Sequence, residues 1–258
     1  MNKQALIILC GLLVSEAAAA ESSLPSLTWC LQDLPPRQFY PANGEPYGPM
    51  VDFMQKLATQ AGFRLTFTPP TPTSRCLKLM QRGEADLMVG LLKTPERSQF
   101  MHLWPVDTAR PASLFTLKSA ALLTSPTELS GRRVALVDAY SYPEEVRAEL
   151  TKLQVQVVRA PTIEEALALL LYQQADVLVG PYHLTLYAIG QNPRFQSIVA
   201  QQQQLASGGV AQNYLALSRK SKYAAKAAQL EQALHQLLLL HKPNFYAVPT
   251  HATGTNPH

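Results

Sequence analysis

This chain has few of the features that mark a nucleic-acid, metal or membrane protein. Its 258 residues carry a formal net charge of only +4, and Arg132 and Arg133 are an isolated basic pair, so no nucleic-acid surface is predicted. The three cysteines and six histidines show no metal-ligand spacing, and neither a metal nor any other cofactor is expected. Beyond residues 1–20, no apolar run approaches the length of a membrane-spanning helix.

The one long apolar run stands at the N-terminus. Lys3 precedes the apolar residues 5–14, and the small residues 17–20 follow. A positive start, an apolar middle and small residues at the end are typical of a secretory signal peptide. We therefore predict that residues 1–20 are a signal peptide cleaved near Ala20 and that the mature protein is periplasmic. A buried N-terminal helix is the alternative.

Only two cysteines, Cys30 and Cys76, remain after such a cleavage. Both fall in the first half of the chain, and an oxidising compartment would allow a disulfide between them. Two separate buried thiols agree with the sequence equally well, so both arrangements are kept as expectations.

The most informative segment is residues 74–97. Cys76, Leu77, Met80 and Leu87 recur at helical spacing, Gly83 is expected to end the helix, and residues 86–90 have the pattern of a short buried strand bounded by glycine. The pattern predicts a helix, then a buried strand, then a polar turn that carries an arginine. Open α/β sheets present ligand-binding groups in this way, at the carboxyl ends of their strands.

A second helix–strand unit of the same kind occupies residues 162–180. Residues 175–180 align with residues 85–90 in both their polar and their apolar positions. Any two helix–strand units share some of this pattern, but the joint match favours two lobes of related build.

The remaining segments complete an alternation of strands and helices. The loop at residues 33–48 is long enough to suggest a functional role, and Ser141 and Glu144 have capping-box spacing before a helix with Pro143 in its first turn. We further predict strands at 27–31, 63–67, 134–137, 155–158 and 214–217, helices at 51–61 and 223–240, an extended crossing segment at 111–117, and a glutamine-rich loop at 193–209.

Several short motifs resemble the periplasmic solute-binding proteins of family 3, the amino-acid-binding type. They are Asn43-Gly44, residues 48–52, residues 83–86, Gly90, residues 94–97 and residues 129–135. The resemblance implies an α/β fold of two lobes, each a mostly parallel sheet flanked by helices, which close on a small ligand. We expect one lobe from residues 21–113 and 205–250, the other from residues 114–204, and a flexible tail at 251–258. It also implies a monomer that serves an ABC importer or a membrane sensor.

In that family the arginine that corresponds to Arg97 holds the carboxylate of the ligand. A guanidinium suits this role because it offers two parallel hydrogen bonds to a carboxylate. Thr94, in the same turn, is included in the expected site. The alternative is that Arg97 only caps its helix or pairs with Glu96 or Asp107.

Other positions depart from the family pattern. Leu92 stands where a serine or threonine is usual, and Gly180 stands where an acidic residue would receive an ammonium group. An ammonium group buried without an acceptor is costly, so we predict an anionic or carboxylate-bearing ligand. The further candidate ligand contacts are Arg37, Arg75, Tyr140, Ser141, Tyr142, Tyr182 and His183.

We expect a binding protein without turnover. The alternative is a periplasmic enzyme on the same fold, such as a dehydratase acting on a carboxylated small molecule. His183, Glu144 or Glu145 would then have to act as the general acid or base.

Overall fold

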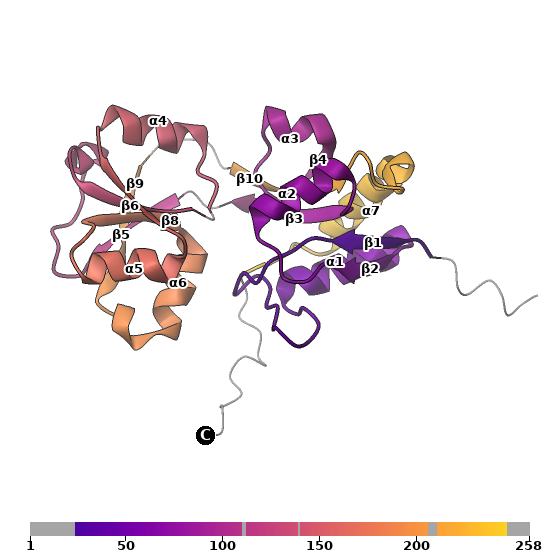
Figure 1. Ribbon diagram of the computed structural model, residues 1–258, viewed down its shortest axis with the longest axis horizontal. Helices are drawn as coiled ribbons and strands as arrows, with labels where there is room; N and C mark the ends of the chain where they lie inside the picture. The colour runs from indigo at the N-terminus through magenta and orange to yellow at the C-terminus, as the bar shows by residue number, and fades with distance from the viewer. Residues whose placement is uncertain (1–23, 110–111, 139, 206–210, 247–258) are drawn as a thin grey trace, which may run out of the picture.

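The computed structural model describes residues 24–109, 112–138, 140–205 and 211–246. The chain forms two lobes, each built on a five-stranded sheet with helices on both faces (Figure 1). This confirms the predicted two-lobed α/β fold. The predicted signal peptide at 1–20 and the predicted tail at 251–258 lie outside the described residues.

The first lobe takes its sheet, in the order β2-β1-β3-β10-β4, from two separated parts of the chain. Its elements are β1 (Ser26–Trp29), α1 (Pro49–Ala61), β2 (Arg64–Phe67), α2 (Thr73–Arg82), β3 (Leu87–Leu91), α3 (Pro95–Phe100), β4 (Met101–Ala109), β10 (Ala211–Ser218), η4 (Ala224–Lys226) and α7 (Ala227–Leu240).

The second lobe lies between β4 and β10 in the sequence, and its sheet has the order β7-β6-β8-β5-β9. Its elements are β5 (Ala112–Leu117), η2 (Pro126–Leu129), β6 (Arg133–Val137), α4 (Glu144–Lys152), β7 (Gln156–Ala160), α5 (Ile163–Leu171), β8 (Val177–Pro181), α6 (Tyr182–Gln191), η3 (Pro193–Phe195) and β9 (Ile198–Gln204).

The two sheets correspond strand by strand, which explains the repeat in the sequence. Asp86 precedes β3 and accepts a hydrogen bond from Thr28 N in β1 at 2.8 Å, while Asp176 precedes β8 and accepts from Arg133 N in β6 at 2.9 Å. Both aspartates therefore join the start of one central strand to its parallel neighbour.

The sheets are mixed rather than mostly parallel. β1 runs parallel to β2 and β3, whereas β10 runs antiparallel to β3 and β4. In the second lobe β6 is parallel to β7 and β8, and β5 is antiparallel to β8 and β9. The antiparallel strands are those that follow a passage of the chain from one lobe to the other.

Each sheet buries side chains on both faces. In β3, Leu87 packs toward α1 and α7, whereas Met88 packs toward α2 on the opposite face. In β6, Val134 packs toward α4 and Ala135 packs toward α5. This alternation is typical of central strands that are covered by helices on both sides.

Two edge strands differ from the sequence prediction. The glutamine-rich segment predicted as a loop contains β9, and residues 101–109, for which no strand was predicted, form β4. Both lie at the edge of their sheet, where polar residues and proline are tolerated because one side of the strand is not paired. In β9, Gln201 Nε2 donates to Thr116 Oγ1 at 2.5 Å, and Gln201 Oε1 accepts from Leu123 N at 3.2 Å.

The capping box predicted at Ser141 is wrong. Helix α4 begins at Glu144, its N-cap residue is Pro143, and no side chain caps it. Pro143 is extended, so Ser141 lies too far upstream to reach the first free N–H groups of the helix. A capping box does form between Ser125 and Glu128 at the start of η2.

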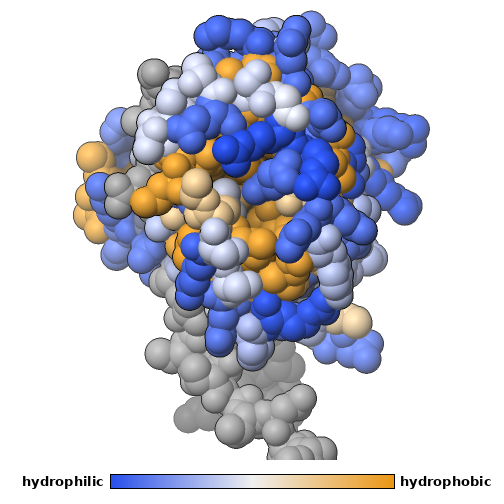
Figure 2. Space-filling view, turned by 90° about the vertical axis from the view of Figure 1, so that its left-hand side faces the viewer, coloured by the Kyte–Doolittle hydropathy of each residue, from blue (hydrophilic) through white to orange (hydrophobic). Residues whose placement is uncertain are grey.

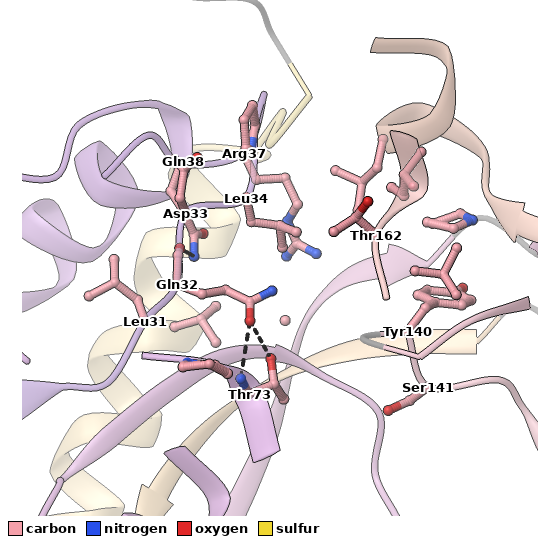
Figure 3. A pocket seen from close by; sticks show the side chains of 18 of the residues that line it. Leu31, Gln32, Asp33, Leu34, Arg37, Gln38, Thr73, Tyr140, Ser141 and Thr162 are labelled. Atoms are coloured by element: carbon pink, nitrogen blue, oxygen red, sulfur yellow. Dashed lines mark hydrogen bonds between the residues drawn. The ribbon is translucent and has the colours of Figure 1, made fainter. Parts of the chain in front are cut away.

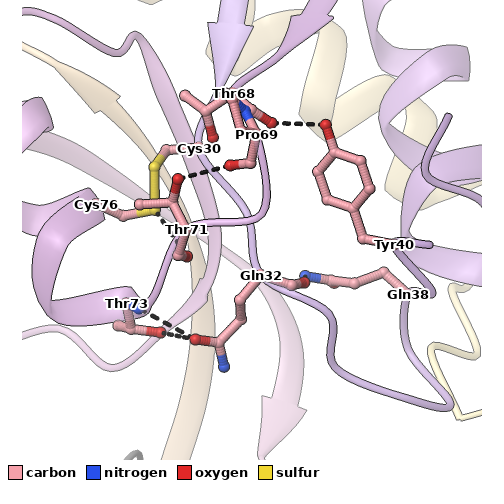
Figure 4. The surroundings of a disulfide bond; sticks show 9 residues. All are labelled: Cys30, Gln32, Gln38, Tyr40, Thr68, Pro69, Thr71, Thr73 and Cys76. Atoms are coloured by element: carbon pink, nitrogen blue, oxygen red, sulfur yellow. Dashed lines mark hydrogen bonds between the residues drawn. A yellow bond between two sulfur atoms is a disulfide. The ribbon is translucent and has the colours of Figure 1, made fainter. Parts of the chain in front are cut away.

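Cys30 and Cys76 form a disulfide, which settles the alternatives that the sequence allowed (Figure 4). Cys30 directly follows β1 and Cys76 lies in α2, and both are buried. Gln32 strengthens the same junction because its Oε1 accepts from both the N–H and the hydroxyl of Thr73 at 3.1 Å. The first loop is thus joined firmly to the start of α2.

No helix within the described ranges is both long and apolar enough to cross a bilayer. The same part of the chain holds no group of three or more His, Cys, Asp or Glu residues suited to a metal ion. Figure 2 shows the end of the molecule formed by the second lobe, where hydrophobic patches are interrupted by hydrophilic side chains.

Replacing both Cys30 and Cys76 by alanine should lower the free energy of unfolding by about 4 kcal/mol, because the disulfide closes a loop with a sequence separation of 46. Urea unfolding followed by circular dichroism measures this loss. A reductant should destabilise the unmodified protein and leave the double variant unchanged. Equal stability of the two proteins under oxidising conditions would contradict a structural role for the disulfide.

Candidate functional site

A cavity of about 790 Å³ lies between the two lobes. It is lined by residues at the carboxyl ends of strands from both sheets, including Trp29 and Leu91 of the first lobe and Val137 and Pro181 of the second. In Figure 3, Gln32, Arg37 and Thr73 approach the cavity from one lobe, and Tyr140, Ser141 and Thr162 approach it from the other. The carboxyl ends of strands are where α/β sheets bind their ligands.

Arg97 lies in α3 and reaches the cavity from the first lobe. Thr94 caps this helix by accepting from Arg97 N at 3.2 Å. The guanidinium donates to the carbonyl of Leu92 at 2.7 Å and to Ser141 Oγ of the second lobe at 3.4 Å. Burial lowers the pKa of Arg97, and the Glu96 carboxylate opposes that effect.

The two carboxylates considered as alternative partners, Glu96 and Asp107, do not form a salt bridge with Arg97 in the described part of the chain. The hydrogen bonds of its guanidinium go instead to the neutral oxygen atoms of Leu92 and Ser141.

Arg37 enters the cavity from the loop between β1 and α1, and the residue is only 6% exposed. Its backbone is fixed on both sides, since Arg37 N donates to Leu34 O and Arg37 O accepts from Met50 N, each at 3.0 Å. The side-chain atoms Nε and Nη2 have no hydrogen-bond partner among the described residues. The guanidinium carbon lies 5.8 Å from the ring centre of Phe245 and 5.6 Å from that of Tyr246.

Gly90 makes room for the Arg37 guanidinium. A Cβ atom at Gly90 would lie 2.6 Å from Arg37 Nη2, and the backbone φ angle of +83° disfavours any other residue. The end of β3 therefore passes directly beneath a buried positive charge.

Aromatic side chains connect the two lobes around this charge. The ring of Tyr246, from the first lobe, stacks on His183 of the second lobe with ring centres 4.1 Å apart. Tyr182 meets the edge of His183 at 5.1 Å, and Phe39 contacts Tyr187 across the lobes at 6.2 Å. Together with the bond from Arg97 to Ser141, these contacts show the two lobes in mutual contact.

Tyr140 lies deep in the second-lobe wall of the cavity. Burial raises the pKa of Tyr140 to about 12, and Tyr246 adds to this rise while the positive charge of Arg37 opposes it. The phenol is therefore neutral at physiological pH and can donate a hydrogen bond.

Six of the nine predicted ligand contacts line the cavity: Arg37, Arg97, Tyr140, Ser141, Tyr182 and His183. The other three do not. Arg75 is exposed on α2, and Thr94 is occupied as the cap of α3. Tyr142 turns into the second lobe, where its hydroxyl accepts from Val137 N and donates to Val179 O, both at 2.8 Å.

The sequence analysis did not identify Asn213, Gln32 and Tyr246 as lining residues. Asn213 is the least obvious of these, since it lies in β10, is 5% exposed, and has an amide nitrogen without a partner in the described structure. The adjacent polar residues Gln212 and Asn213, near the start of a strand that is otherwise largely apolar, were the available signal. The cavity also has two acidic lining residues, Asp33 and Glu164, and both are exposed.

Comparison with known proteins agrees with this geometry. The family model of the bacterial extracellular solute-binding proteins, family 3, matches residues 28–238. The chain belongs to this family. Its members are typically periplasmic or extracellular, and the resemblance predicted from the sequence motifs is confirmed.

The individual relatives are distant. The virulence sensor protein BvgS of Bordetella pertussis (strain Tohama I) is 28% identical over 178 residues, which are 69% of this chain and 14% of BvgS, so the chain spans about one seventh of that relative. The GluR0 ligand-binding core in complex with L-glutamate has a TM-score of 0.69 at 18% identity, covering 85% of this chain and 94% of GluR0.

A histidine kinase sensor domain with similarity to periplasmic binding proteins has a TM-score of 0.68 at 21% identity, covering 84% of this chain and 91% of that domain. At these identities the solved structures show a shared fold. The family, like the neighbours named here, consists of ligand-binding rather than enzymatic domains.

Substituting Tyr142 by phenylalanine should lower the free energy of unfolding by about 1–3 kcal/mol, because the N–H of Val137 and the carbonyl of Val179 would both lose their shared partner. Tyr140→Phe is the matched control, because Tyr140 lines the cavity rather than joining two strands as Tyr142 does. Loss of the Tyr140 hydroxyl should cost less than about 0.5 kcal/mol. Thermal or denaturant unfolding measures both. A larger loss for Tyr140→Phe would reverse the roles assigned to the two tyrosines.

Proposed function

We propose that this chain is an exported solute-binding domain that captures a small carboxylate-bearing ligand between its two lobes. The observation that carries the proposal is Arg97, a partly buried guanidinium that lines the cavity and bonds only to neutral oxygen atoms among the described residues.

The hydrogen-bonding capacity of Arg97 supports this role. A guanidinium carries five N–H donors, and Arg97 uses one of them to bind Leu92 O and another to bind Ser141 Oγ. A carboxylate could therefore bind the remaining donors in the cavity, where partial desolvation strengthens a charge-assisted hydrogen bond. The GluR0 core, a neighbour in fold, is complexed with L-glutamate, which also carries carboxylate groups.

Ligand-driven closure is the proposed mechanism. The donors of Arg97 belong to the first lobe, whereas Ser141, Tyr140 and His183 belong to the second. A ligand that contacts both sets favours the conformation in which the lobes are closed, by as much as its affinity differs between the open and closed forms. The closed form would be read by an ABC importer or a membrane sensor, and BvgS and the histidine kinase sensor domain favour a sensor.

We propose binding without turnover. His183 stacks on Tyr246 and meets the edge of Tyr182, so its ring forms part of an aromatic wall. Glu144 and Glu145, the other acid–base candidates, are exposed at the start of α4 and do not line the cavity. Conversion of a bound carboxylate by the purified protein, abolished by His183→Ala, would contradict this proposal.

Replacing Arg97 by alanine should weaken carboxylate binding by about tenfold or more, since a hydrogen bond to a charged group contributes about 1.5–3 kcal/mol. A screen of carboxylic acids by thermal shift, followed by calorimetry on those that bind, measures the effect.

Arg75→Ala is the matched control for charge, because Arg75 is an exposed first-lobe arginine outside the cavity. The control should bind like the unmodified protein. Undiminished binding by Arg97→Ala, or stabilisation only by neutral and cationic compounds, would overturn the proposal.

A further inference from the structure

We propose that the ligand carries two anionic groups and that Arg37 binds the second one. This inference rests on the proposed function, in which Arg97 binds the first. It makes Arg37 the residue that separates dianionic ligands from monoanionic ones.

The primary observation is that Arg37 is buried while part of its guanidinium has no hydrogen-bond partner among the described residues. The residue is only 6% exposed, and two of its buried side-chain nitrogen atoms, Nε and Nη2, lack hydrogen-bond partners in the described structure. A buried charge without a partner is expensive, so such groups normally pair with an opposite charge. The rings of Phe245 and Tyr246 lie near the guanidinium but do not satisfy its N–H donors. The guanidinium points into the cavity between the lobes (Figure 3), so a ligand can supply the missing anion.

The second observation is that both arginines approach the backbone near the carboxyl end of β3. Arg37 Nη2 lies over Gly90, while Arg97 Nη1 binds the carbonyl of Leu92, two residues further along. Two residues of chain span at most about 7 Å, so the backbone points that the two guanidinium groups approach lie close enough together for one small ligand to reach both. Because both groups approach from the same lobe, they match two carboxylates at the ends of a short aliphatic dicarboxylate.

The remaining cavity groups favour negative charge as well. Asn213 lies next to this part of β3, since its neighbour Tyr214 pairs with Leu91, and its buried amide nitrogen has no partner among the residues described. Asp33 and Glu164 are both exposed, and the Asp33 carboxylate already accepts from Tyr40 N at 2.7 Å. The interior of the cavity thus presents two positive charges and a free donor.

The decisive experiment compares short dicarboxylates with their own monoamides on the unmodified protein. Glutarate and its monoamide are a suitable pair because they have nearly the same size and differ by one negative charge. Succinate and adipate, each with its monoamide, extend the series to shorter and longer separations of the two carboxylates. Calorimetry should show at least one dicarboxylate binding about 10- to 100-fold more tightly than its monoamide.

Arg37→Met should remove this preference by weakening the dicarboxylate to the level of its monoamide, while monoamide binding changes less than about threefold. Gly90→Ala tests the same contact without altering the charge, because the added methyl group would displace the guanidinium. Arg75→Met is the control for the loss of a first-lobe arginine, and circular dichroism shows whether each variant is folded.

The outcomes separate the two proposals. Suppose that no dicarboxylate binds more tightly than its monoamide, and that Arg97→Ala abolishes the binding of both compounds. This result would overturn the role of Arg37 and leave the proposed function intact. A retained preference in folded Arg37→Met would also overturn it. If no carboxylate in the series or in the acid screen binds the unmodified protein, the proposed function fails as well.

Discussion

The buried charge of Arg37 is the constraint around which the cleft is organised. Its backbone is fixed between the first loop and the start of α1, and its guanidinium lies over Gly90, where a side chain would collide with it. Phe245 and Tyr246 cover it from the returning C-terminal part of the chain, and Tyr140 approaches it from the other lobe. Keeping an ion in such a place costs free energy, and sites that retain one commonly use it for binding.

The central framework could be predicted from the sequence because its signals are local and repeated. The runs at residues 85–90 and 175–180 share an aspartate before an apolar strand, and each aspartate binds the backbone of the adjacent parallel strand. Strands buried on both faces are apolar throughout, so β3, β6 and β8 were evident. The prediction that Arg97 lines the ligand site followed from its position after β3 and from the family motif.

The edges and the orientation of the site residues could not be predicted in the same way. An edge strand pairs on one side only, so β4 can contain Pro105 and β9 can be rich in glutamine without the usual strand pattern. Tyr140 and Tyr142 stand two positions apart, yet only Tyr140 reaches the cavity, because the hydroxyl of Tyr142 joins β6 to β8. Tyr246 reaches the cavity only through the return of the chain after α7, a tertiary contact that leaves no periodic signal.

The location of both arginines on the first lobe has a kinetic consequence for the proposed site. An anion that diffuses toward the open cleft is attracted by one lobe alone, so Arg37 and Arg97 would influence the association rate and its dependence on ionic strength. Under the proposed closure, contacts of a ligand with second-lobe residues such as Ser141 and Tyr140 would be completed as the lobes meet around it. Those residues would therefore set the residence time of the complex, and entry and release could be changed independently by substitutions on different lobes.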